Sequence, residues 1–273
     1  MAELKIKVNI MENKRIVIKV GTSTLTYENG KLNLRRIQQL CRVLSDLQNA
    51  GNQIVLVSSG AVGVGIGKLG LKERPTSTPE RQALAAVGQC ELMFMYDKIF
   101  GEYNNTVAQV LLTRDVIDDP ILRTNALNTF KTLIDMSIIP IVNENDTVAT
   151  DEIEGANFGD NDMLSALVAK VVDADLLVIL TDIDGLFETN PREDPYAKLL
   201  KRVPKITDEI KHMAGGTGSN RGTGGMTSKI LAAEVATNAG IECCILNGSD
   251  PKNLYDLIEG HNPGTVFEAQ SSN

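Results

Sequence analysis

Short apolar runs rich in β-branched residues recur along the chain, and longer stretches with apolar residues at helical spacing separate them. The runs predict buried strands at 15–20, 53–59, 106–112, 137–143, 175–181 and 241–247. The intervening stretches predict helices after the N-cap residue Asn33 and at 80–103, 122–136, 161–172, 207–213, 226–239 and 250–258. Strands that alternate with helices predict an α/β fold with a mainly parallel sheet covered on both faces.

Polar and glycine-rich segments follow four of the predicted strands, at 21–26, 58–65, 143–152 and 181–187. In open α/β sheets, ligands bind beyond the carboxyl ends of the strands. We therefore expect a binding site to be built from these four segments.

Composition excludes several classes of function. The 273 residues carry a formal net charge of −8, with no Trp and no dense basic stripe, which argues against a nucleic-acid partner. No apolar run approaches the roughly 20 residues that span a bilayer, and the N-terminus lacks a secretory signal, so we expect a soluble cytoplasmic protein with no membrane partner. The four Cys form no C-x-x-C motif and the two His lie far apart, which predicts buried, reduced thiols and no zinc site.

Two familiar glycine motifs do not fit this chain. The segment GIGKLG at 65–70 has the letters of a dinucleotide-binding fingerprint, but it follows the second predicted strand after six residues rather than the first strand directly. Val62 stands where a P-loop needs its first glycine. We therefore interpret 60–70 as a glycine-rich turn and expect neither dinucleotide binding nor a P-loop.

Two strand ends carry candidate anion ligands, each with a plainer alternative. Lys19 interrupts an apolar strand and precedes Gly21, so it either meets an anion inside the protein or points to solvent from an edge strand. Ser59 follows the second strand, where it either donates to a carboxylate or phosphate beside a nest of backbone N–H groups or lies in a close-packed turn.

The segment between the fourth strand and the next helix is dense in amides and carboxylates. Within twenty residues it contains Asn143, Glu144, Asn145, Asp146, Asp160, Asn161 and Asp162. A solvated acidic loop is one interpretation. The mixture also suits a zwitterion, because carboxylates bind an ammonium group and amides bind a carboxylate. Asp162, at the start of an apolar helix, is placed to pair with buried lysines.

The glycine-rich run GTGSNRGTGGMTSK at 216–229 ends on Lys229, in the first turn of a predicted helix. A helix N-terminus binds phosphate through its free N–H groups and dipole, so we favour a phosphate-holding loop over a slack linker, with 214–221 as a lid. Lys19, Lys229 and Asp162 then match phosphoryl transfer, with Mg²⁺ carried on the nucleotide phosphates. A carboxylate acceptor is already ionised at neutral pH, so it needs no general base.

These motifs occur in the order found in one known family. The segments IVIKVGTSTLT, IVLVSSGAVGVG, LAAVGQ, VAQVLLT, IVNENDTVAT, FGDNDMLSALVA, LLVILTDIDGLF, NP and GTGGMTSK together resemble glutamate 5-kinases of the amino acid kinase family, over about residues 14–268. The resemblance implies a three-layer αβα sandwich with a mainly parallel sheet of about eight strands. It also implies ATP-dependent phosphorylation of the γ-carboxylate of L-glutamate to γ-glutamyl 5-phosphate, the first step of proline biosynthesis.

The resemblance further implies roles for individual residues. Lys19 and Lys229 would stabilise the transferring phosphoryl group, and Asp162 would orient both lysines. Glutamate would be held by Ser59, Asp146 and Asn161, with Asn143 and Asp160 nearby. ATP would be held by Lys19, Thr181, Asp182, Thr223, Gly224, Gly225, Met226, Thr227, Ser228 and Lys229.

Domain organisation and partners follow from the same resemblance. It implies an N-terminal extension at 1–13, a substrate-binding lobe over about 14–172 and a nucleotide-binding lobe over about 173–270, without the C-terminal PUA domain of many relatives. A homo-oligomer, inhibition by proline and channelling of the product to glutamyl phosphate reductase are further expectations. Two alternatives stay open. One is a sister kinase acting on acetylglutamate, aspartate, carbamate or a nucleoside monophosphate, and the other is a catalytically silent amino-acid sensor, which would not need to keep both lysines and Asp162.

Overall fold

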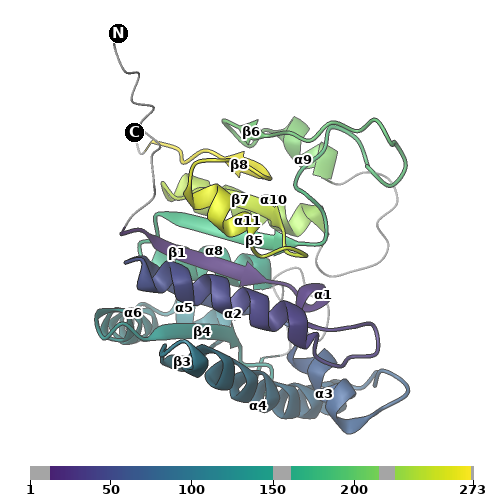
Figure 1. Cartoon of the computed structure of the whole chain (residues 1–273), viewed down its shortest axis with the longest axis vertical. Coiled ribbons are helices and arrows are strands. Elements are labelled where there is room, and N and C mark those ends of the chain that lie inside the picture. Colours follow the sequence, from purple (N-terminus) through teal and green to yellow (C-terminus); the bar gives the residue numbers. More distant parts are fainter. Residues whose placement is uncertain (1–12, 150–160, 215–224, 272–273) are drawn as a thin grey trace.

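A sheet of eight strands forms the centre of the computed structural model, which describes residues 13–149, 161–214 and 225–271 (Figure 1). The strands are β1 Arg15–Val20, β2 Gln53–Ser58, β3 Val107–Leu112, β4 Ile139–Glu144, β5 Leu176–Thr181, β6 Arg202–Val203, β7 Glu242–Asn247 and β8 Thr265–Phe267. Their order across the sheet is β3-β4-β2-β1-β5-β7-β8-β6. Neighbouring strands are parallel except β7 and β8. The expectation of a mainly parallel sheet of about eight strands is confirmed.

Helices cover both faces of the sheet (Figure 1). They are α1 Thr22–Leu25, α2 Leu34–Asn49, α3 Ala61–Leu69, α4 Thr78–Glu102, α5 Arg114–Asp118, α6 Pro120–Asp135, α8 Asn161–Val171, α9 Asp208–Ala214, α10 Met226–Asn238 and α11 Asn253–Ile258. Apolar residues of α2, α4 and α11 share one core cluster with one face of the sheet, and those of α6, α8 and α10 share a second cluster with the other face. The three-layer αβα sandwich is therefore confirmed.

Strand β1 lies in the middle of the sheet, between β2 and β5. Its side chains alternate between the two faces, so Ile16 and Ile18 join the cluster of α2, whereas Val17 joins the cluster of α8 and α10. Lys19 has the same parity as Val17 and therefore faces the layer of α8 and α10. The residue is only 5% exposed, so the alternative of an edge-strand lysine pointing to solvent is wrong.

The two halves of the chain occupy different halves of the sheet. Residues up to the end of α8 supply β3, β4, β2 and β1, and later residues supply β5, β7, β8 and β6. The assignment of substrate binding to the first half and nucleotide binding to the second stays a prediction. The expected extension at 1–13 lies outside the described residues except for residue 13.

The segment 60–70 forms helix α3 and its caps, so the prediction of a glycine-rich turn there is wrong. Its glycines allow very close packing. A Cβ on Gly65 would lie 2.1 Å from the carbonyl oxygen of Leu84, and a Cβ on Gly67 would lie 2.3 Å from the carbonyl oxygen of Gly30. The glycines that match a dinucleotide-binding fingerprint therefore allow the backbone of α3 to pack directly against the backbone of neighbouring segments.

Gly88 on α4 makes an even closer approach, because a Cβ there would lie 1.8 Å from the carbonyl oxygen of Ala61. Replacing Gly88 with Ala should lower the free energy of unfolding by about 1–3 kcal/mol, since α3 and α4 must move apart. The matched control is Gly101→Ala on the same helix, where the added methyl meets no atom within 4 Å and should be neutral or stabilise by up to about 1 kcal/mol. Urea unfolding measures both variants, and equal midpoints would contradict this account.

Three of the four cysteines, Cys41, Cys243 and Cys244, are buried, and all four thiols are free. Burial raises the pKa of the Cys41 and Cys243 thiols, which keeps them protonated as core residues. Cys90 is exposed on α4, so the expectation of buried thiols is wrong at that position.

Across the described residues, no helix combines the length and the apolar character needed to cross a membrane.

Candidate active site

Three charged side chains from distant parts of the chain meet inside the protein. Lys19 comes from β1, Asp162 from the first turn of α8 and Lys229 from the first turn of α10. Lys19 Nζ lies 2.6 Å from Asp162 Oδ1, and Lys229 Nζ lies 3.0 Å from Asp162 Oδ2. The Asp162 side chain is 0% exposed and each lysine side chain is 6% exposed. We call these three residues the charge cluster.

The charge cluster contains two basic side chains and one carboxylate. Burial by itself would raise the pKa of the Asp162 carboxyl, but the ammonium groups of Lys19 and Lys229 outweigh burial and hold this pKa well below its usual value. Asp162 is therefore ionised at neutral pH, and within the cluster its single carboxylate contacts the side chains of two basic residues. Two basic side chains held next to one another and shielded from water attract an anion, so the cluster is suited to bind phosphate.

The beginning of α10 contributes further donors to the charge cluster. Gly225 is the N-cap residue of this helix. The Ser228 hydroxyl lies 2.8 Å from Asp162 Oδ2 and 2.8 Å from the Gly225 carbonyl oxygen, so it donates to one of them at a time. The free N–H groups and the dipole at a helix N-terminus favour anions. The first turn of α10 therefore adds to the attraction of the two lysines for phosphate.

A chain of hydrogen bonds connects Ser59 with three amide side chains. Asn161, the neighbour of Asp162, donates from Nδ2 to Ser59 Oγ and to Asn143 Oδ1, both at 3.1 Å. Asn143 Nδ2 in turn donates to Gln89 Oε1 at 2.9 Å. Among the described residues, the buried Oδ1 of Asn161 has no hydrogen-bond partner. Because an unsatisfied buried oxygen is unfavourable, this atom is suited to accept a hydrogen bond from a ligand.

A cavity of about 210 Å³ lies beside this chain of hydrogen bonds. Its lining residues are Thr22, Gly60, Ala61, Val62, Gly63, Arg74, Arg81, Asn143, Asp146 and Asn161. The first residues of α3 are among them, so the N-terminus of this helix adds N–H donors to the wall. The cavity thus combines groups that bind anions with groups that bind cations, as a zwitterionic ligand requires.

Asp146 is the acidic residue of the cavity wall. Burial raises the pKa of its carboxyl to about 6, and the positive charge of Arg81 opposes this rise. The folded protein therefore holds the Asp146 proton more tightly than the unfolded chain does, where an Asp has a pKa of about 3.9. Ionisation of Asp146 consequently lowers the stability of the fold as the pH rises from about 4 to about 6, and the full loss persists above pH 6.

Replacing Asp146 with Asn should stabilise the protein at pH 8, because the ionisation penalty disappears. The gain in the free energy of unfolding should reach about 2–3 kcal/mol and should shrink as the pH falls from about 6 towards 4. Thermal unfolding at several pH values measures it, with Asp97→Asn on the exposed surface of α4 as the control that shows no such gain. A variant that is less stable than the parent protein at pH 8 would contradict the raised pKa.

Most of the residues expected to hold the nucleotide lie at the end of β5 and at the start of α10. Thr181 ends β5, which pairs with β1, and its hydroxyl donates to Asp182 Oδ1 at 3.2 Å. Asp182 is exposed and forms an ion pair with Arg192. Met226 and Thr227 lie with Ser228 in the first turn of α10. Outside the described residues lie Asp160, Thr223, Gly224 and all but residue 214 of the expected lid at 214–221.

Three residues near the site were missed by the sequence analysis. Arg81 and Arg74 line the cavity, and Gln89 ends the chain of amide hydrogen bonds. Gln89 belongs to the quoted motif LAAVGQ, and it lies eight residues after Arg81 on α4. This spacing puts both residues on one face of the helix, which was the signal available in the sequence.

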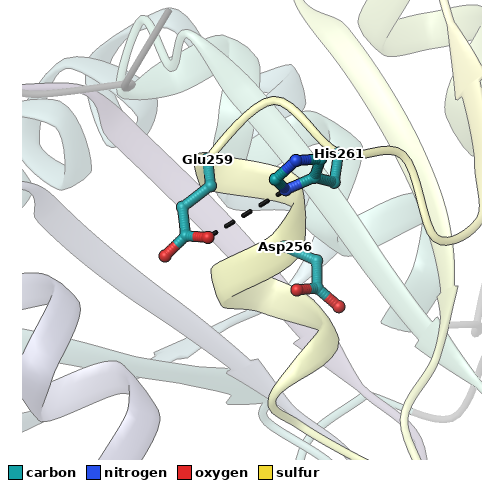
Figure 2. Close-up of side chains that lie close together, drawn as sticks. All are labelled: Asp256, Glu259 and His261. Atoms are coloured by element: carbon teal, nitrogen blue, oxygen red, sulfur yellow. Dashed lines mark ion pairs between the residues drawn. The ribbon is translucent and has the colours of Figure 1, made fainter. Parts of the chain in front are cut away.

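A separate group of possible metal ligands lies at the end of α11. Figure 2 shows Asp256, Glu259 and His261, with His261 Nδ1 4.0 Å from Glu259 Oε2. All three side chains are exposed, and none of them lines the cavity. Exposed carboxylates often gather on protein surfaces, so we assign this group no role in the site.

Solved structures share this fold at low sequence identity. A UMP kinase from Ureaplasma parvum has a TM-score of 0.64 at 14% identity, covering 94% of this chain and 100% of its own. An isopentenyl phosphate kinase from T. acidophilum has a TM-score of 0.62 at 16% identity, covering 93% of this chain and 100% of its own. At these identities the likeness establishes the fold alone.

Sequence comparisons reach much closer relatives. A protein named glutamate 5-kinase from Clostridium perfringens is 56% identical over 96% of this chain and 97% of its own length. A second protein of that name, from Listeria innocua, is 54% identical over 96% of this chain and 95% of its own length. The family model described as "Amino acid kinase family" matches residues 14–247. The chain belongs to the amino acid kinase family.

Proposed function

We propose that this protein transfers the γ-phosphoryl group of ATP to the γ-carboxylate of L-glutamate and releases γ-glutamyl 5-phosphate, the first intermediate of proline biosynthesis. The observation that carries the proposal is the charge cluster, in which the ammonium groups of Lys19 and Lys229 share the Asp162 carboxylate. The glutamate 5-kinases that match this chain at 56% and 54% identity support the choice of acceptor. Membership of a kinase family supports ATP as the donor.

The acceptor amino acid binds in the cavity in this proposal. Its ammonium group meets the Asp146 carboxylate and the Oδ1 atom of Asn161, two acceptors on the same wall. Ser59 and Asn143 hold the Asn161 amide in the orientation that turns Oδ1 towards the ligand. Asp160 is proposed as a further contact from outside the described residues. Because Asn161 and Asp162 are adjacent in sequence, the head group in the cavity and the reacting carboxylate at the charge cluster are only a short distance apart.

The donor nucleotide binds beyond the carboxyl ends of β1 and β5 in this proposal. Thr181 and Asp182 contact the nucleoside, and the first turn of α10 receives the phosphates. Contributing residues there are Gly225, Met226, Thr227, Ser228 and Lys229, together with Thr223 and Gly224 from outside the described residues. Asp162 already binds two lysines, so it is poorly suited to ligate a metal directly. Mg²⁺ would therefore reach the site on the nucleotide phosphates, where it neutralises phosphate charge.

The chemistry that follows needs no general base. The glutamate γ-carboxylate is ionised at neutral pH, and one of its oxygens forms a bond to the γ-phosphorus while the bond from that phosphorus to the bridging oxygen of ADP breaks. Lys19 and Lys229 stabilise the negative charge that spreads over the transferring group. Asp162 keeps both ammonium groups at fixed positions before the nucleotide arrives, so no reorganisation is needed during the reaction.

An assay with hydroxylamine tests the proposal. Acyl phosphates react with hydroxylamine to give hydroxamates, so ATP, Mg²⁺ and each candidate acid are supplied in turn and the hydroxamate is measured. Product with glutamate supports the proposal. Product only with aspartate or acetylglutamate, or ADP release only with carbamate or a nucleoside monophosphate, would support a sister kinase instead. No turnover of any of them would favour an amino-acid sensor.

Regulation and assembly are further parts of this proposal. Proline also carries an amino-acid head group, so the proposed contacts of the cavity suit it as a competitive inhibitor. A homo-oligomer, a cytoplasmic location and transfer of the unstable product to glutamyl phosphate reductase are proposed from the family resemblance. Kinetics with varied glutamate at several proline concentrations test the inhibition, and light scattering of the purified protein tests the homo-oligomer.

A further inference from the structure

Two arginines line the cavity, and neither has a part in the mechanism described above. Arg81 lies in the first turns of α4 and is half-buried, whereas Arg74 precedes the helix and is exposed. Both belong to the cavity wall that also contains Asp146 and Asn161. A binding site for an α-amino acid needs a cation close to its ammonium acceptors, because the α-carboxylate and the ammonium group are attached to the same carbon.

We infer that Arg81 binds the α-carboxylate of the amino-acid substrate and thereby selects α-amino acids over other carboxylic acids. This inference rests on the proposed function. Arg81 and Asp146 line the same cavity, so one bound head group can meet a cation and a carboxylate there, and the charge of Arg81 also acts on the Asp146 carboxyl group. The guanidinium group presents paired N–H donors that match the two oxygens of a carboxylate.

The position of Arg81 near the N-terminus of α4 makes anion binding at this side chain more favourable. The side chain projects from the N-terminal part of a 25-residue helix, where the helix dipole is positive. Arg74 shares the cavity wall, but its side chain is exposed, so water screens its charge. We therefore assign the main contact to Arg81 and at most a weak one to Arg74.

Substrate analogues separate this role from a structural one. 4-Aminobutyrate has the reacting carboxylate and the ammonium group of glutamate but lacks the α-carboxylate, whereas glutarate has both carboxylates and lacks the ammonium group. In Arg81→Ala, kcat/KM for glutamate should fall by about 10- to 100-fold, the usual effect of losing a hydrogen bond to a charged group. The value for glutarate should fall by a similar factor, and the value for 4-aminobutyrate should stay within about twofold. Where turnover of an analogue is too slow to measure, its inhibition constant against glutamate is compared between Arg81→Ala and the parent protein instead.

Two further variants complete the experiment. Arg81→Lys should recover part of the loss, because a lysine restores the charge but not the paired donors. Lys98→Ala removes a basic side chain from an exposed position of the same helix. It should leave kcat/KM for glutamate, glutarate and 4-aminobutyrate equal to the values of the parent protein. Equal losses with glutamate and 4-aminobutyrate in Arg81→Ala would overturn the inference and leave the proposed function standing. A parent protein that makes no hydroxamate from glutamate would instead overturn the proposed function, and the inference with it.

Discussion

Replacing Lys229 with Met should lower kcat by about 10²- to 10³-fold, because one of the two cations that stabilise the transferring phosphoryl group is lost. KM for glutamate should change much less, since Lys229 lies at the charge cluster and does not line the cavity. Steady-state kinetics with varied glutamate measures both constants. An unchanged kcat would remove Lys229 from its proposed role.

The same variant should keep its stability, which distinguishes a catalytic lysine from a structural one. Without Lys229, the Asp162 carboxylate keeps its ion pair with Lys19, in which Nζ and Oδ1 lie 2.6 Å apart. The melting temperature should therefore stay equal to that of the parent protein or rise. Lys211→Met is the matched control, because Lys211 forms an ion pair with Glu234 in a partly exposed position and should affect neither kcat nor stability by a large amount. A large loss of stability in Lys229→Met would show that the low kcat reflects misfolding.

Replacing Asp162 with Asn should have the opposite effect on stability. Lys19 and Lys229 would then lose the buried carboxylate that both of them contact, and removing one partner of a buried ion pair typically costs about 3–5 kcal/mol. For a chain of this size the melting temperature should fall by roughly 6–15 °C. Thermal unfolding followed by circular dichroism measures the shift. Activity should fall as well, because the lysines lose the group that positions them.

Two comparisons make this expectation specific to the charge cluster. Asp118→Asn removes an exposed ion pair with Arg114 and should cost at most about 1 kcal/mol. ATP should raise the melting temperature of Asp162→Asn more than that of the parent protein, because its phosphates supply part of the missing negative charge. Equal losses of stability in Asp162→Asn and Asp118→Asn would contradict the claim that the Asp162 carboxylate stabilises Lys19 and Lys229 inside the protein.

The sheet could be predicted from the sequence because its strands are continuous apolar runs. β2, β5 and β7 are almost entirely buried, so hydrophobicity alone marks them. Four short elements, α1, α5, β6 and β8, were not predicted, because two to five residues carry no measurable periodicity. Tertiary packing decides the conformation of α3, since its glycines have low helix propensity but allow contact with Leu84 and Gly30.

The site was predictable where residues follow strands and unpredictable where they lie on a helix surface. Lys19 and Asp162 stand out in the sequence because a charge within or beside an apolar run needs a partner. The spacing of Arg81 and Gln89 places both on one face of α4, but the sequence does not tell that this face points into a cavity. Their position depends on the packing of α3 against α4 through Gly88, a contact between segments that sequence periodicity does not relate.

The division of the sheet between the two parts of the chain has a consequence for protein engineering. The segment 172–175 is the connection between α8, which supplies Asp162, and β5, which begins the half that supplies Lys229. Two polypeptides separated at this segment would each contain an incomplete set of the reacting charges, with Lys19 and Asp162 on one and Lys229 on the other. Turnover should then appear only when the fragments reassociate along β1 and β5, so the enzyme could serve as a reporter of whether two fused partners meet.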